Sequence, residues 1–156
     1  MKKRIVIINN EKCIKIKNDI YCQNIEMKAL PESLASFFDI QMLLRKSKIF
    51  PVHKIAIKNI ILSSNIFSFI FGLFKFLNNV NTKYLIIAIT PYTFFAYLLL
   101  YLTRKKIFLY LRSDGLDEYK LILGRKFVWV YKFMLFLMRK KSIVLCVNNK
   151  IIQDNR

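Results

Sequence analysis

The apolar run from Tyr84 to Leu102, YLIIAITPYTFFAYLLLYL, limits the possible folds of this chain more than any other stretch. It is nineteen residues long and uncharged, with Lys83 before it and Arg104-Lys105-Lys106 after it. A stretch of about 18 or more apolar residues is long enough to cross a bilayer as a helix. The run therefore belongs either to a membrane span or to the interior of a folded domain.

Two details within the run favour a folded domain. Its first part, YLIIAI, is rich in β-branched and aromatic residues, as is typical of a buried strand. Thr90-Pro91 follows, and threonine is a good helix N-cap while proline is favoured at the first helical position. The pattern predicts a strand, a cap and a helix, with the membrane span as the alternative.

The same alternation of strand and helix continues through the second half of the chain. Strands are predicted at Tyr84–Ile89, Ile107–Leu111 and Ile143–Val147, with apolar helices between them. These strands are apolar on both faces, which indicates a parallel sheet covered by helices on both sides. We expect the three to be neighbouring inner strands.

The first half adds a strand at Arg4–Ile8 and a β-hairpin that turns at Asn18-Asp19. A short helix that begins at Pro31 is predicted next, followed by strands at residues 39–47 and 53–59. The predicted fold class is therefore α/β: a single Rossmann-like domain over residues 1–156, with a mostly parallel sheet, helices on both faces and an N-terminal β-hairpin.

The net charge of +18, from 27 basic and nine acidic residues, predicts attraction to anionic surfaces. The basic residues form small groups along the chain and do not gather on a recognisable nucleic-acid-binding element, so no nucleic-acid partner is expected. Three cysteines without a CxxC pair, and a single histidine, argue against a metal site. An odd cysteine count without a signal peptide favours reduced thiols in the cytoplasm.

Ligands of α/β sheets bind at the carboxyl ends of the strands, so the residues after each strand are the candidates for a site. They are Asn9-Asn10, Arg45-Lys46-Ser47, Thr90-Pro91-Tyr92, residues 112–115 (RSDG) and Asn148-Asn149. Three glycines in the whole chain leave no GxGxxG motif and no P-loop. No phosphate cradle and no cofactor are therefore predicted.

The RSDG loop is the most polar of these candidates. Arg112 can bind a phosphate or carboxylate, Ser113 can help to bind an anion, and Asp114 can act as a base or accept a sugar hydroxyl. The alternative is a helix start, in which Ser113 or Asp114 is the N-cap while Asp117 and Glu118 complement the helix dipole. Both interpretations can hold together. Thr90-Pro91-Tyr92 is likewise interpreted first as a helix start.

Residues 83–124, KYLIIAITPYTFFAYLLLYLTRKKIFLYLRSDGLDEYKLILG, resemble the amino-terminal half of bacterial glycosyltransferases of the GT-B fold, of the family-4-like group. The resemblance implies two Rossmann-like domains across a cleft, the first holding the acceptor and the second a nucleotide-sugar. Many relatives carry a histidine or aspartate beside the sugar in the loop that RSDG occupies, so Asp114 is the implied catalytic residue. The implied substrate contacts are Arg112, Ser113, Gly115, Glu118, Thr90 and Tyr92.

The expected function is thus the acceptor-binding half of a glycosyltransferase that moves a sugar onto a surface polysaccharide or lipid-linked glycan. The chain stops where relatives continue into the donor-binding domain, so it is expected to be inactive alone. A basic, aromatic-rich chain is further expected to lie at the anionic inner face of the cytoplasmic membrane. A small integral membrane protein with two or three spans and no enzyme activity is the alternative.

Overall fold

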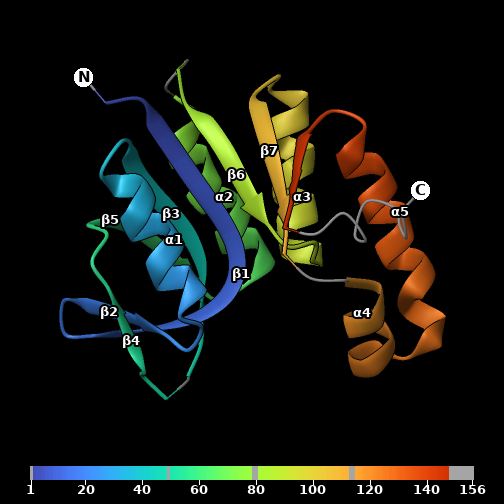
Figure 1. Ribbon diagram of the computed structural model, residues 1–156, viewed down its shortest axis with the longest axis horizontal. Coiled ribbons are helices and arrows are strands. Elements are labelled where there is room, and N and C mark those ends of the chain that lie inside the picture. The colour runs from blue at the N-terminus through green and yellow to red at the C-terminus, as the bar shows by residue number, and fades with distance from the viewer. Residues whose placement is uncertain (1, 49, 79–80, 113–114, 148–156) are drawn as a thin grey trace.

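A computed structural model describes residues 2–48, 50–78, 81–112 and 115–147, and its centre is a parallel sheet (Figure 1). Six strands run parallel in the order β5-β3-β1-β6-β7-β8. They are β1 (Arg4–Ile16), β3 (Asp39–Lys46), β5 (Asn59–Ser63), β6 (Lys83–Ile87), β7 (Lys106–Leu111) and β8 (Ile143–Cys146). The order reverses between β1 and β6, as in doubly wound α/β domains, so the predicted fold class is confirmed.

Helices cover both faces of this sheet (Figure 1). α1 (Glu26–Ala35) packs on one face against Ile7, Met42 and Ile87. α2 (Ile66–Leu77), α3 (Pro91–Leu102) and α5 (Val128–Arg139) pack on the other face, which includes Val6 and Ile8. Because side chains alternate along a strand, neighbouring residues of β1 enter opposite cores. α4 (Gly115–Leu123) and a short 3-10 turn (Arg125–Phe127) precede α5.

The apolar run of residues 84–102 forms a βα unit, as its pattern predicts. β6 ends at Ile87, Ala88 has a φ of 62°, and α3 begins at Pro91. The Thr90 hydroxyl accepts the backbone N–H of Thr93 at 3.3 Å, and the Thr93 hydroxyl accepts that of Thr90 at 2.8 Å. This reciprocal cap satisfies two backbone groups that the first helical turn leaves unpaired. Within the described part of the chain, no helix is both long and apolar enough to traverse a bilayer.

The three strands predicted as neighbours are neighbours, but β8 is at the edge of the sheet and not inside it. Ile143 is 47% exposed and Leu145 is 43% exposed. The error has a physical cause: a run apolar on both faces predicts burial of both, yet no helix of the described residues covers the α1 side of β8. The sequence pattern reports apolarity and does not report where the layer of helices ends.

The N-terminal hairpin is present, with its turn one residue earlier than predicted. β1 pairs antiparallel with β2 (Asp19–Cys22), and the closing pair is Ile16 with Asp19. The turn residues are therefore Lys17 and Asn18, and Lys17 has a φ of 53°.

Two further predictions in the first half were wrong. The helix predicted to begin at Pro31 begins at Glu26, and Pro31 lies inside α1. The strand predicted over residues 53–59 is only the short β4 (His53–Ile55), which pairs with β2. The separate parallel strand β5 was not predicted, because five residues with little alternation become a strand only by pairing with β3.

Candidate functional site

The candidate site lies at the carboxyl edge of the sheet, where the strand order reverses. The parallel pairing of β1 with β6 ends at Asn9 and Ile87, and its pairing with β3 shifts register between Ile8 and Lys12. Asn9, Asn10 and Glu11 therefore leave the ladder with β3 at the point where β1 turns into the hairpin. Such a reversal is the favoured ligand position in open α/β sheets.

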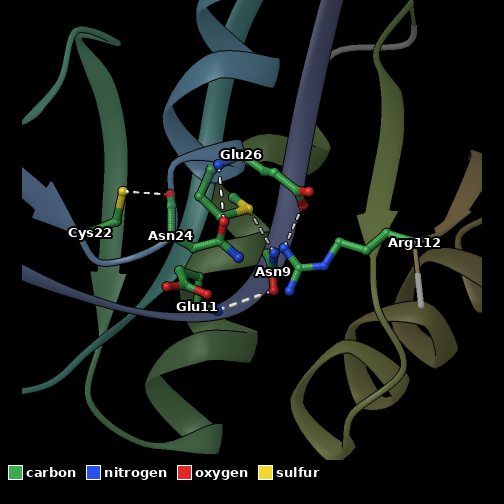
Figure 2. Close-up of polar contacts among 7 residues, drawn as sticks. Asn9, Glu11, Cys22, Asn24, Glu26 and Arg112 are labelled. Atoms are coloured by element: carbon green, nitrogen blue, oxygen red, sulfur yellow. Dashed lines mark hydrogen bonds and ion pairs between the residues drawn. The ribbon is translucent and has the colours of Figure 1, made fainter. Parts of the chain in front are cut away.

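Two polar contacts link the end of β2, the loop after it and the start of α1 (Figure 2). The Cys22 thiol donates to the carbonyl of Asn24 at 3.3 Å. The Asn24 side-chain oxygen accepts the backbone N–H of Glu26 at 3.0 Å and so starts α1. Burial raises the pKa of Cys22 to about 11, so this thiol keeps its proton at neutral pH.

An ion pair joins the end of β7 to the start of α1. Arg112 Nη1 lies 2.7 Å from Glu26 Oε2, and Figure 2 shows the two side chains extended toward each other across the strand ends. The Arg112 side chain is 31% exposed and that of Glu26 is 62% exposed. A pair this exposed contributes at most about 1 kcal/mol of stability. Both groups can therefore exchange partners and bind a ligand at low cost.

Glu11 is an acidic residue at this edge, and the pKa of its carboxyl is shifted by its surroundings. Its backbone N–H donates to the Asn9 side chain at 3.1 Å. Burial raises the pKa of the Glu11 carboxyl above its usual range, while Arg112 and the backbone N–H of Asn24 act to lower it. A carboxyl with a raised pKa next to an arginine is a candidate proton acceptor.

A pocket of about 330 Å³, hereafter the crevice, opens beside the ion pair. Its polar groups come from Arg112, Glu26 and Ser33, and its apolar walls from Met27, Ala29, Leu30, Ile87 and Tyr110. The Asn9 amide donates to the sulfur of Met27 at 2.8 Å and fixes one wall of the pocket. This mixture of apolar walls and a few polar groups is typical of small-ligand sites, and the volume suits a ligand the size of a sugar unit.

A second polar group lies at the carboxyl edge on the α3 side. The Arg45 guanidinium is 5.0 Å from the centre of the Tyr92 ring, which meets Phe69 edge-on. Arg45 Nε and the side-chain oxygen of Asn10 are buried and have no hydrogen-bond partner among the described residues. A donor and an acceptor without partners are suited to bind a hydroxylated ligand.

The predicted site residues fall into three groups. Arg112 points into the crevice, and Tyr92 supports Arg45. Thr90 caps α3, and Gly115 begins α4 where a Cβ would overlap the Tyr131 ring, so contacts within the fold account for both.

The remaining predicted residues were not placed. Ser113, Asp114 and Asn148-Asn149 lie outside the described residues, as does the side chain of Glu118. The catalytic role of Asp114 therefore stays a prediction.

Sequence reasoning missed three polar residues at this edge of the sheet: Glu11, Asn24 and Glu26. Glu11 directly follows the candidate residues Asn9-Asn10, but no motif in the sequence singles it out. Asn24 is a favoured residue type for a helix start, and this signal could have placed the start of α1 correctly. Glu26 would then have been expected at the sheet edge.

Taken together, the crevice offers the Glu26 carboxylate, the Arg112 guanidinium and the Ser33 hydroxyl, which bind hydroxyl groups by hydrogen bonds. Nowhere in the described ranges do three His, Cys, Asp or Glu side chains gather in a way that could hold a metal ion.

Comparisons with models of known protein families, with curated protein sequences and with solved structures find no match to this chain.

Proposed function

We propose that this chain is the acceptor-binding domain of a GT-B-type glycosyltransferase, which presents a glycan hydroxyl to a nucleotide-sugar held by a second domain. The observation that carries the proposal is the crevice at the reversal of strand order, lined by the ion pair of Glu26 and Arg112. The Glu11 carboxyl lies near enough to Arg112 for the guanidinium to lower its pKa. The resemblance of residues 83–124 to the amino-terminal half of such enzymes supports it further.

The start of α1 favours a hydroxylated acceptor over a nucleotide diphosphate. Diphosphates bind at helix N-termini through free backbone N–H groups. Here the Asn24 side chain already accepts the N–H of Glu26, and the Glu26 carboxylate stands at the same helix end. A second negative charge would be repelled there, whereas a sugar hydroxyl can bind either to the carboxylate or to the Arg112 guanidinium.

In this proposal a carboxylate at the sheet edge accepts the proton of the acceptor hydroxyl. The hydroxyl oxygen then bonds to the anomeric carbon of the donor sugar, and the nucleotide leaves with its phosphate oxygens. Glu11 is one candidate, because its raised pKa strengthens its affinity for a proton. Asp114 is the other candidate, because it follows β7 in the sequence. In the sheet, β7 is separated from β1 only by β6.

The net charge of +18 supports a location at the anionic inner face of the cytoplasmic membrane, where a surface polysaccharide or lipid-linked glycan would be the acceptor.

Nuclear magnetic resonance of the ¹⁵N-labelled chain tests this function. Neutral oligosaccharides should shift the backbone signals of Asn9, Asn24 and Glu26, and nucleotide-sugars should not. Glu26→Gln should weaken the oligosaccharide shifts. The matched control is Asp19→Asn, which removes an acid from another partly exposed ion pair, Asp19–Lys54 at 2.8 Å, outside the crevice. Micromolar binding of a nucleotide-sugar to the crevice would overturn the proposal, as would oligosaccharide shifts confined to other parts of the chain.

A further inference from the structure

Large apolar side chains are exposed along three helices. Phe67 is 75% exposed and Trp129 is 69% exposed, although both are of types that normally avoid water. We call the exposed apolar residues of these helices the outer-face residues: Phe67, Phe71, Phe74, Phe95, Leu102, Trp129, Phe133 and Phe136. So many on neighbouring helices form a patch and not scattered single residues.

The outer-face residues all point away from the sheet. On α2, Phe67, Phe71 and Phe74 follow the spacing i, i+4, i+7, and the buried residues Phe69 and Phe76 lie on the opposite side of the helix. On α5, Trp129, Phe133 and Phe136 have the same spacing, opposite the buried Tyr131 and Met138.

α3 follows the same rule and joins the other two helices into one layer. Its Phe95 and Leu102 are exposed, while Ala96 and Leu100 are buried. The Phe94 ring of α3 contacts Phe133 of α5 at 6.4 Å between centroids, and α2 packs beside α3. All three helices lie on one face of the sheet (Figure 1). Because α3 packs against both α2 and α5, the outer stripes of the three helices are neighbours.

This surface is basic as well as apolar. The sequences of α2, α3 and α5 contain no aspartate and no glutamate. Lys75 and Lys132 are exposed on α2 and α5, and Lys140 follows α5 with its ammonium 4.4 Å from the centre of the Phe136 ring. Apolar stripes with basic residues beside them are the pattern of elements that bind anionic membrane interfaces.

We propose that the layer of α2, α3 and α5 docks on an anionic lipid bilayer. The outer-face residues enter the boundary between headgroups and acyl chains, and the lysines lie against lipid phosphates. A second copy of the chain fits less well, since two basic surfaces would repel each other. The docking does not depend on which ligand the crevice binds, so either proposal can fail alone.

Trp129 provides a direct assay, because it is the single tryptophan of the chain and lies on the proposed surface. Its fluorescence emission should shift to shorter wavelength with equimolar phosphatidylcholine–phosphatidylglycerol vesicles and change little with phosphatidylcholine alone. Lipids brominated in their acyl chains should quench it. Binding should weaken as salt is added, because salt screens the attraction.

Paired variants test which surface binds. Phe67→Ser with Phe71→Ser should weaken binding to the mixed vesicles about tenfold or more, because two exposed apolar side chains no longer enter the bilayer. The control is Phe37→Ser with Phe50→Ser, which are similarly exposed but lie outside the three helices and should leave binding within about twofold.

Three outcomes would overturn the proposal. The first is equal loss of vesicle binding in both variant pairs. The second is a blue shift without vesicles that grows with protein concentration, which would assign the surface to self-association. The third is a blue shift with single-stranded DNA and none with vesicles, which would assign it to nucleic acid.

Discussion

Tyr84→Phe tests whether the C-terminus of α2 is fixed by a side chain from the neighbouring strand. Tyr84 is fully buried, and its hydroxyl donates to the backbone carbonyl of Phe76 at 2.8 Å. Phe76 lies in the last turn of α2, where carbonyl groups have no partner within the helix. The substitution removes one oxygen, keeps the ring and leaves that carbonyl unpaired.

A buried acceptor left unpaired costs about 1–3 kcal/mol. We expect Tyr84→Phe to lower the free energy of unfolding by about 2 kcal/mol, which corresponds to a fall in Tm of about 4–8 °C for a domain of this size. Urea denaturation and a thermal melt measure both. Tyr101→Phe is the control, because Tyr101 is exposed and its loss should cost less than about 0.5 kcal/mol.

The difference in stability between the natural chain and Tyr84→Phe should also depend on pH. Burial raises the pKa of Tyr84 from its ordinary value of 10 to about 12. The stability supplied by the neutral hydroxyl is therefore complete below pH 10 and is lost as the pH rises toward 12. Phenylalanine does not titrate, so the gap between the two proteins should narrow in alkali. A constant gap, or a Tyr84→Phe as mild as Tyr101→Phe, would refute the reasoning.

Three other predictions concern the site and its surroundings. Glu11→Gln should stabilise the chain at neutral pH, because burial raises the Glu11 pKa and penalises the ionised carboxylate. Urea titrations should show this gain in stability vanish in acid, where Glu11 is protonated, and a gain that persists in acid would contradict this cause. Gly115→Ala should cost about 1–3 kcal/mol in urea denaturation, because the added methyl overlaps the Tyr131 ring, and a neutral effect would disprove the close approach. Asp114→Asn should fold normally and lose most sugar transfer when a donor domain is supplied in trans, whereas Asp117→Asn should keep it; an active Asp114→Asn would leave Asp114 only a helix start.

The sequence alone determined the βα units, because the interactions that define them are local. Thr90 caps α3 and Asn65 caps α2 through partners three residues away. The strand at residues 84–87 is apolar on both faces, which identifies a buried parallel strand before any partner is known.

Only the tertiary structure decided the crevice. Arg112 and Glu26 form their ion pair across 86 residues of sequence. The pKa of Glu11 is raised because its carboxyl is buried where β1 shifts register. The sequence near Glu11 indicates neither the burial nor the register shift.

The tertiary structure also decided which faces of the helices remain outside. α2 is apolar on both sides, so its sequence predicts a helix but not the side that meets the sheet. Packing settles this at Gly72, where an added Cβ would lie 3.0 Å from Leu43 and 3.1 Å from Ile61. The one residue without a side chain lets the helix approach the strands, and the phenylalanines on the opposite side are consequently left facing outward.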